Sequence, residues 1–212
     1  MAYYVGLDLG QSADYTALSI AQSVNELNGG GEAKKHLHLR HLERYPLRTP
    51  YTEVADGVAA LMRSPTLSED EFDPIRRRVS KPTLELLVDK TGVGVAVTDL
   101  LKARGLKFTS ITITGGEKSH MGSGREYSVP KRDLVAALEV PFHNGELRVA
   151  EGLALWPTLR EELLNFRRKV NLKTAHDSYE HWRESDHDDL VLACALACWG
   201  ARRPRSVLRV IR

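Results

Sequence analysis

The chain of 212 residues contains little cysteine, few aromatic residues and almost no net charge. Its two cysteines, Cys194 and Cys198, lie four positions apart in an apolar run, which predicts small core residues on one helix face and leaves too few thiolates for a zinc site. No apolar run approaches the roughly 20 residues that span a bilayer, and Met1–Tyr4 lacks the basic start of a signal peptide. We therefore expect an intracellular protein in a reducing compartment, without membrane contact.

The size and charge of the chain limit what it can form. With 42% hydrophobic and 27% charged residues it can build one hydrophobic core, so we expect one domain over residues 1–200 and a basic tail over 201–212. The net charge of +2 is small, and affinity for nucleic acid must therefore come from local basic clusters. Lys131-Arg132 and Arg202-Arg203 are such clusters, although a charge run more commonly marks a solvated face.

An acidic residue stands inside the first apolar run. Tyr3–Gly10 has the composition of a strand and carries Asp8, and a polar turn then leads to a second apolar run at Ala17–Ala21, which together predict a hairpin. Burying an unpaired carboxylate is costly, so Asp8 needs a cation or hydrogen-bond donors. Asp8 is therefore a candidate metal ligand, and the alternative is a turn aspartate that caps backbone amides.

Beyond the hairpin, the pattern changes from consecutive strands to alternating strands and helices. We expect a third strand at 36–45, with its leucines toward the core and with His36 and His38 on a solvated face. A helix at 51–62, a surface loop at 64–81, a strand at 83–89, a helix at 95–104 and a strand at 107–114 follow. This order predicts an α/β fold with a mixed sheet, antiparallel at its start and parallel later, and helices on both faces.

Asp89 ends the strand expected at 83–89. Open α/β sheets place their ligands at the carboxyl ends of parallel strands, which makes Asp89 a second candidate site residue; a helix-capping aspartate is the alternative. Gly92 and Gly94 follow at once, but they are not accompanied by the Lys-Ser/Thr of a P-loop or by the third glycine of a dinucleotide site. The sequence therefore does not favour nucleotide binding at this turn.

A glycine- and serine-rich loop at 115–127 carries Lys118, His120 and Arg125, and the helix expected at 129–139 carries Lys131 and Arg132 in its first turn. A mobile backbone with scattered cations suits a segment that closes over a polyanion. We expect these five residues to line the path of DNA, and an ordinary surface loop is the alternative. A short strand at 145–150 and an amphipathic helix at 157–170 follow.

A third acidic group precedes an alanine-rich apolar helix that extends to Trp199. Asp186 or Asp188 could cap this helix, but with Asp189 the group exceeds what capping requires. Carboxylates brought into one site repel each other unless hard cations such as Mg²⁺ or Mn²⁺ neutralise them. Two such ions roughly 3.5 to 4 Å apart can activate a water and stabilise the leaving oxygen in phosphodiester hydrolysis.

Three motifs follow one another along the chain: Gly6-Leu-Asp8 with Asp14-Tyr-Thr16, Val88-Asp89 with Gly92-Val-Gly94, and His187-Asp-Asp-Leu-Val-Leu-Ala193. Together with Val129–Leu134, Gly145–Gly152 and Leu163–Arg167, this order resembles the RNase H-like nuclease domain of phage terminase large subunits. The resemblance implies an RNase H-like mixed β-sheet and an endonuclease that cuts phage DNA concatemers during packaging. It also implies two Mg²⁺ or Mn²⁺ ions held by Asp8, Asp89, and Asp188 or Asp189.

The chain departs from this family pattern in two ways. No Gly-x-x-x-x-Gly-Lys-Ser/Thr occurs, so the sequence is either an excised nuclease domain or a free-standing relative that works with a separate packaging ATPase. The other implied partners are double-stranded DNA, a small terminase subunit and a portal, in the cytoplasm of a bacterial host. Many relatives carry another aspartate where this chain has Leu192, and a related resolvase pattern favours Asp189 over Asp188 as the third ligand. The alternatives are a junction resolvase of the same fold and a sugar-kinase or actin-like phosphotransferase.

Overall fold

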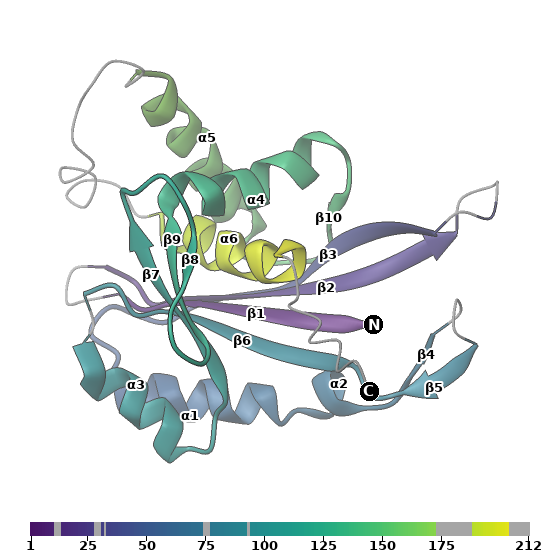
Figure 1. Cartoon of the computed structure of the whole chain (residues 1–212), viewed down its shortest axis with the longest axis horizontal. Helices are drawn as coiled ribbons and strands as arrows, with labels where there is room; N and C mark the ends of the chain where they lie inside the picture. Colours follow the sequence, from purple (N-terminus) through teal and green to yellow (C-terminus); the bar gives the residue numbers. More distant parts are fainter. Residues whose placement is uncertain are drawn as a thin grey trace.

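The structure, a computed structural model, describes residues 1–10, 14–27, 31, 33–73, 77–92, 94–172 and 188–203. Its centre is an eight-stranded sheet with the order β10-β3-β2-β1-β6-β7-β9-β8 (Figure 1). The strands of this sheet are β1 (Ala2–Asp8), β2 (Ala17–Leu27), β3 (Ala33–Arg44), β6 (Thr83–Asp89), β7 (Phe108–Thr114), β8 (His120–Met121), β9 (Glu126–Pro130) and β10 (Leu147–Val149).

The sheet has an antiparallel and a parallel part that meet at β1. Strands β1, β2 and β3 pair antiparallel, as the apolar alternation of the first 45 residues predicted. On its other side β1 pairs parallel with β6, and the pairs β6–β7 and β7–β9 are parallel too. The predicted central strand ending at Asp89 is therefore confirmed, and the segments carrying Asp8 and Asp89 are direct neighbours.

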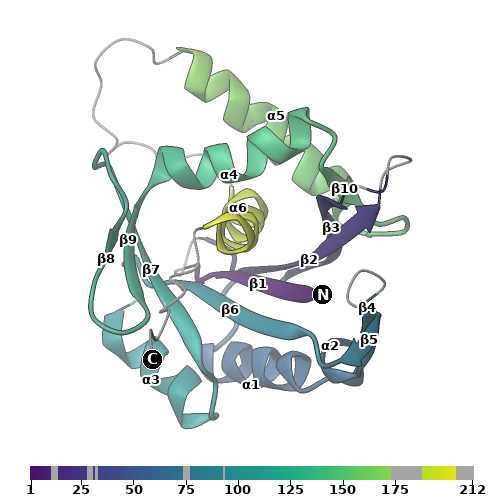
Figure 2. The same cartoon turned by 45° about the vertical axis from the view of Figure 1, so that its right-hand side comes forward.

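Helices cover both faces of the sheet, as expected (Figure 2). One face packs against α1 (Tyr51–Met62) and α3 (Gly94–Ala103), and the other against α4 (Lys131–His143), α5 (Trp156–Leu172) and α6 (Asp189–Arg202). Each face has its own hydrophobic core, because alternate residues of β1 and β6 point in opposite directions. No helix in the described ranges is long and apolar enough to cross a membrane.

Helix α6 lies against the middle of the sheet at backbone distance. A methyl group added at Gly6 would lie 2.0 Å from the carbonyl oxygen of Ala193, and one added at Gly200 would lie 2.7 Å from Leu87. The alanines of α6 and its two free cysteines are buried, which confirms the prediction that Cys194 and Cys198 are core residues. Small residues on both elements allow this close approach.

Some local predictions need correction. The segment 64–81 contains the short helix α2 (Pro65–Ser68) and a small hairpin of β4 (Glu71–Asp73) and β5 (Arg78–Ser80), and the expected loop at 115–127 contains β8 and the start of β9. The leucines of β3 are buried as predicted, but His36 is 7% exposed rather than solvated, because Glu26 of the adjacent β2 lies across it. The basic tail stays a prediction, since residues 204–212 lie outside the described ranges.

Candidate active site

Asp8 and Asp89 occupy matching positions on two neighbouring parallel strands. Leu7 pairs with Val88, so the next residues of β1 and β6 are Asp8 and Asp89. Leu7 and Val88 belong to the core under α1 and α3, and strand alternation turns the following side chains toward α6. Each aspartate is 7% exposed. Two buried carboxylates therefore lie side by side, on strands about 4.8 Å apart.

Asp189 lies above this pair because α6 runs antiparallel to β1. Gly6 contacts the backbone of Ala193, whereas the side chain of Tyr4 lies near Gly200. One helical turn before Ala193 brings the chain to Asp189, and two strand residues after Gly6 bring it to Asp8; both steps cover about 6 Å. Asp189, which is 4% exposed, is thus placed over Asp8 by the pitch of the helix.

The electrostatics of Asp8 reflect the other acids near it. Burial raises the pKa of Asp8 well above its usual range, and the charges of Asp89, Asp189 and Asp188 raise it further, while Lys131 alone among the main contributors lowers it. Three residues that are far apart in sequence therefore act on one carboxyl group. Such a group binds either a proton or a cation, because the ionised form is disfavoured on its own.

Asp188 stands at the N-cap position of α6 but does not cap the helix. Its side chain accepts no capping hydrogen bond from the first turn. Instead, its Oδ2 lies 3.1 Å from Nζ of Lys131, at the start of α4. The capping interpretation is wrong for Asp188, and its side chain points to the acidic group. Asp186 and His187 lie outside the described residues.

Two residues of the site were missed by sequence reasoning: Glu162 of α5 and Arg44 at the end of β3. Oε2 of Glu162 accepts hydrogen bonds from the backbone N–H groups of Leu190 and Val191, at 3.0 and 3.2 Å. Its Oε1 pairs with the guanidinium of Arg44, which also lies 3.8 Å from Oδ2 of Asp189. Glu162 thus supplies the cap that Asp188 does not, and together with Arg44 it fixes the first turn of α6.

The surroundings of Glu162 shift its protonation. Burial raises the pKa of Glu162 to about 7 and the charge of Asp189 acts in the same direction, against Arg44 and the two amides. A signal for this residue was present in the sequence, because Glu162 lies between Leu159 and Leu163 on the apolar face of the helix. An acid within an apolar stripe needs a partner, and Arg44 could not be identified from 118 residues away.

Asp89 also has a backbone role. Its Oδ1 accepts a hydrogen bond of 2.7 Å from the N–H of Thr91, and Oγ1 of Thr91 accepts one of 2.8 Å from the N–H of Ile113. These bonds tie the turn after β6 to β7. Helix capping was the alternative for this aspartate; the hydrogen bond that it accepts lies instead in the turn before α3, and it leaves Asp89 on an ordered strand end.

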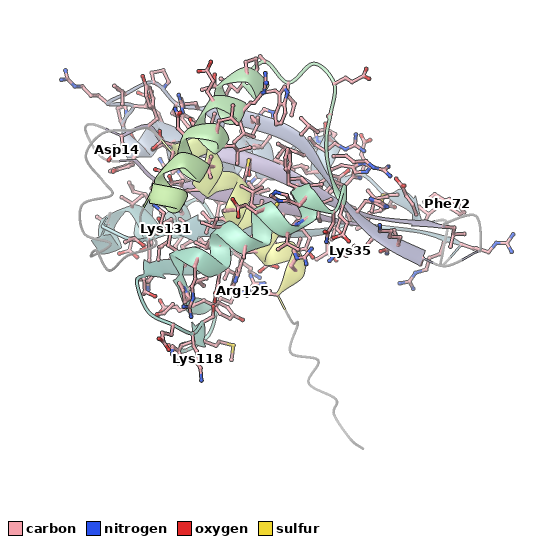
Figure 3. The ribbon with its side chains drawn as sticks, turned by 90° about the horizontal axis from the view of Figure 1, so that it is seen from above. Asp14, Lys35, Phe72, Lys118, Arg125 and Lys131 are labelled. Carbon is pink, nitrogen blue, oxygen red and sulfur yellow. The ribbon has the colours of Figure 1, made fainter. Side chains whose placement is uncertain are left out.

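The five predicted DNA-binding residues do not lie together; Figure 3 labels three of them, Lys118, Arg125 and Lys131. Lys131 lies at the acids, beside Asp188. Lys118 and His120 are exposed next to the edge strand β8, and Arg132 of α4 hydrogen-bonds to the carbonyl oxygen of Glu117 nearby. Arg125 lines a hollow beside α3, on the opposite face of the sheet. The structure therefore brings only Lys131 to the acids.

The chemistry of the donor set fits divalent metal ions. The converging side chains offer carboxylate oxygens, the ligands that Mg²⁺ and Mn²⁺ prefer, and the burial of Asp8 and Asp189 keeps competing water away. In the described part of the chain no three potential ligands already surround a common point. The carboxylates are gathered on one small area and would have to close around an ion by side-chain rotation.

Comparison with known proteins gives a match in structure but none in sequence. Neither protein-family models nor curated proteins match the chain. The large terminase nuclease from the thermophilic phage G20c aligns with a TM-score of 0.54 and 19% identity, over 94% of this chain and 81% of that one. The Mn-soaked, inhibitor-bound nuclease domain of human cytomegalovirus terminase aligns with a TM-score of 0.52 and 15% identity, over 94% and 83%.

The eight-stranded mixed sheet with helices on both faces is thus an RNase H-like α/β fold. Within that fold, the chain is similar to the nuclease domains of terminase large subunits, as the order of its acidic motifs predicted. The phosphotransferase alternative required two related halves around a cleft. The described residues instead form one large sheet and one small hairpin.

Proposed function

We propose that the chain is a metal-dependent endonuclease that cuts double-stranded DNA. The observation that carries the proposal is the placement of Asp8 and Asp89 side by side, with Asp189 one helical turn from the closest contact of α6 with β1. Three acids around the buried carboxyl group of Asp8 are unfavourable for stability and suit cation binding. The similarity in fold to terminase nucleases supports the same conclusion.

Asp8, Asp89 and Asp189 would hold two Mg²⁺ or Mn²⁺ ions, with Asp188 as the other candidate ligand. When bound, such a pair of ions activates a water and stabilises the leaving oxygen of the phosphodiester. The chain's own contribution is to keep these carboxylates ordered, through the sheet register and through Glu162. Lys131 provides a positive charge next to Asp188, where it can contact the DNA phosphate beside the cut bond.

The biological setting is proposed from similarity alone. We infer that the enzyme cuts DNA concatemers during genome packaging in the cytoplasm of a bacterial host. It would act with a packaging ATPase, in the same longer chain or in a separate protein, and with a small terminase subunit and a portal, since these 212 residues contain no P-loop. Lys118, His120 and Arg132, on the exposed side next to β8, would contact the DNA backbone.

A cleavage assay tests the proposal. Purified protein is incubated with supercoiled plasmid, a linear duplex and a four-way junction, each with Mg²⁺, Mn²⁺ or EDTA. We expect nicking and linearisation of the plasmid with Mn²⁺ and Mg²⁺, none with EDTA, and cutting of the linear duplex. Preference for the four-way junction would instead identify a resolvase, and cutting that persists in EDTA would refute the metal mechanism.

A further inference from the structure

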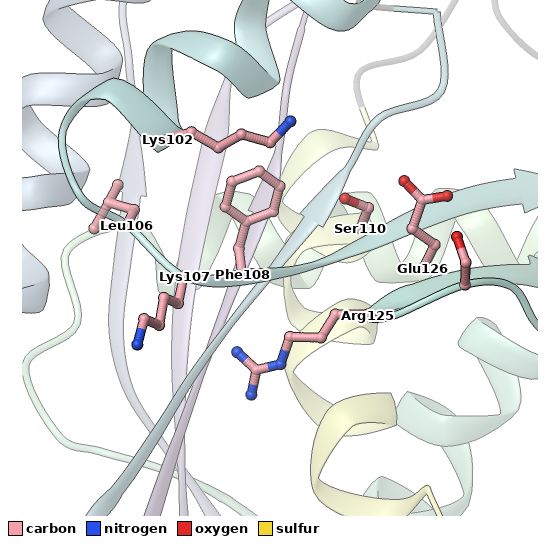
Figure 4. A pocket seen from close by; sticks show the side chains of 8 residues that line it. Lys102, Leu106, Lys107, Phe108, Ser110, Arg125 and Glu126 are labelled. Atoms are coloured by element: carbon pink, nitrogen blue, oxygen red, sulfur yellow. The ribbon is translucent and has the colours of Figure 1, made fainter.

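A hollow of about 670 Å³ lies on the face of the sheet opposite the acids (Figure 4). Two turns enclose it: the turn from α3 into β7, with Lys102, Lys107 and Phe108, and the turn from β8 into β9, with Ser123 and Arg125. Phe108 belongs to the core under α1 and α3, which fixes the side of the sheet. A hollow of this size can accommodate one nucleotide unit.

Polar side chains border the hollow without a partner among the residues that the structure describes. Ser110 is 8% exposed and borders the hollow, yet its hydroxyl forms no hydrogen bond with any residue the structure describes. Within the same described ranges, the side chains of Lys107 and Arg125 form no hydrogen bond or ion pair either. The Ser110 hydroxyl and two exposed cations therefore border one hollow, and this set of donors suits an anionic ligand.

The main chain holds these groups in place. The N–H of Ser110 donates a hydrogen bond of 2.8 Å to the carbonyl oxygen of Arg125, which ties the two turns together. The acid that also lines the hollow, Glu126, is neutralised by Lys90 at 3.2 Å. The net charge that faces the hollow is therefore positive; Ser110 lies on β7, and Lys107 and Arg125 lie in the turns directly before β7 and β9.

We propose that this hollow binds a phosphodiester of the DNA strand several base pairs away from the cut site. A guanidinium, an ammonium and a hydroxyl are the donors with which proteins bind phosphate. The ring of Phe108 adds an apolar surface for the sugar or base (Figure 4). The inference rests on the proposed function, because it extends the DNA footprint of the same enzyme.

Strand register gives the scale of this footprint. Asp89 pairs with Ile111 and Ile111 with Tyr127, so Arg125 lies two strands across and two residues back from Asp89, or about 12 Å between Cα atoms. The path around the edge at β8 is longer, and it passes the exposed Lys118 and His120. Since phosphates advance about 3.4 Å per nucleotide, the direct separation alone corresponds to about four nucleotides, and DNA must extend further than this from the cut to reach the hollow.

Binding measurements in EDTA test the proposal without depending on cleavage. Wild type, Lys107→Ala/Arg125→Ala, and the control Lys34→Ala/Arg48→Ala, which removes two exposed cations elsewhere, are titrated with labelled duplexes of about 12 and about 40 base pairs. We expect the Lys107/Arg125 variant to bind the long duplex about tenfold more weakly, with a salt slope reduced by about 2. Its affinity for the short duplex, and the control's affinity for both, should stay within about twofold of wild type.

Two results would overturn the inference. One is equal loss of affinity for both duplex lengths, which would place these cations at the cut site. The other is binding of free dAMP that depends on Lys107 and Arg125 while the long duplex does not, which would make the hollow a nucleotide site. If wild type fails to cut any DNA, the proposed function fails, but the comparison of long and short duplexes still decides the role of the hollow.

Discussion

Strand β6 carries two equally buried acids on the same face, and their surroundings differ. Glu85, at its start, accepts a hydrogen bond of 2.9 Å from Thr109 and pairs with Arg203, whose guanidinium stacks over the rings of Tyr127 and Trp199. Asp89, at its end, lies among other carboxylates. Both are 7% exposed. Burial alone therefore does not identify a functional acid; the charge of the groups around it does.

The two ends of α6 follow the same division. At its C-terminal end Arg203 meets Glu85, and at its N-terminal end Asp189 meets Asp8. The first contact pairs opposite charges and stabilises the fold, whereas the second gathers like charges and destabilises it in the absence of a cation. Variants at the N-terminal end should consequently lose activity but not stability, and variants at the C-terminal end should lose stability but not activity.

The largest expected effect comes from Asp8→Asn or Asp89→Asn. Each substitution keeps the shape but removes a charge, and metal-dependent cleavage should fall by more than about 1,000-fold. Thermal stability without metal should not decrease for Asp8→Asn, since a repelling charge is removed. Plasmid cleavage and thermal unfolding measure these two properties, and Mn²⁺ soaking shows whether the variant still binds the ion. Near wild-type cleavage by either variant would contradict the nuclease proposal.

Glu162→Ala should have the next largest effect. It leaves the amides of Leu190 and Val191 without an acceptor and Arg44 without its partner, at a cost of about 4 kcal/mol in the free energy of unfolding. Glu162→Gln, which keeps an acceptor oxygen, should regain much of this stability. Urea unfolding and Mn²⁺ titration by calorimetry separate the two roles. If Ala and Gln behave alike in both, Glu162 does not position Asp189.

The pH dependence of stability should reflect Glu162. Its pKa rises from the usual 4.5 to about 7 on folding, so between these values the folded state holds a proton that the unfolded state releases. The free energy of unfolding should therefore decrease as pH rises from 4.5 to 7, by up to about 3 kcal/mol, with Asp8 acting in the same direction. Urea unfolding in EDTA measures this slope, which Glu162→Gln should flatten.

Arg203→Ala should give the smallest effect and the opposite signature. Removing Arg203 should lower the free energy of unfolding by about 2 kcal/mol, less than the loss of every partner would cost, because Thr109 still donates a hydrogen bond to Glu85. Cleavage at temperatures where the variant is folded should stay within about threefold of wild type. A loss of activity as large as that of Asp8→Asn would remove the distinction between the two ends.

The helices and strands of this molecule could be predicted from the sequence, because each has a periodic pattern of apolar residues. The alternation of apolar residues and the positions of strand ends were enough to predict the mixed sheet, the two strands that carry Asp8 and Asp89, and the helix that carries Asp189. The pairing of Arg44 with Glu162 could not be predicted, because it depends on how β3 and α5, which are distant in sequence, approach each other. Arg125 was grouped with Lys131 by sequence distance, whereas the β8–β9 hairpin turns it to the opposite face of the sheet.

Gly6 sets the distance between Asp8 and Asp189 through backbone contact rather than through a side chain. Its missing methyl group allows the carbonyl oxygen of Ala193 to approach β1, and the hydroxyl of Ser19 on β2 donates a hydrogen bond of 2.9 Å to that same oxygen. The separation of Asp8 from Asp189 is thus inherited from two backbones in contact. A change of one carbon at Gly6 would move the whole helix away from the sheet and separate Asp189 from Asp8 and Asp89, without a change in any of the three acids.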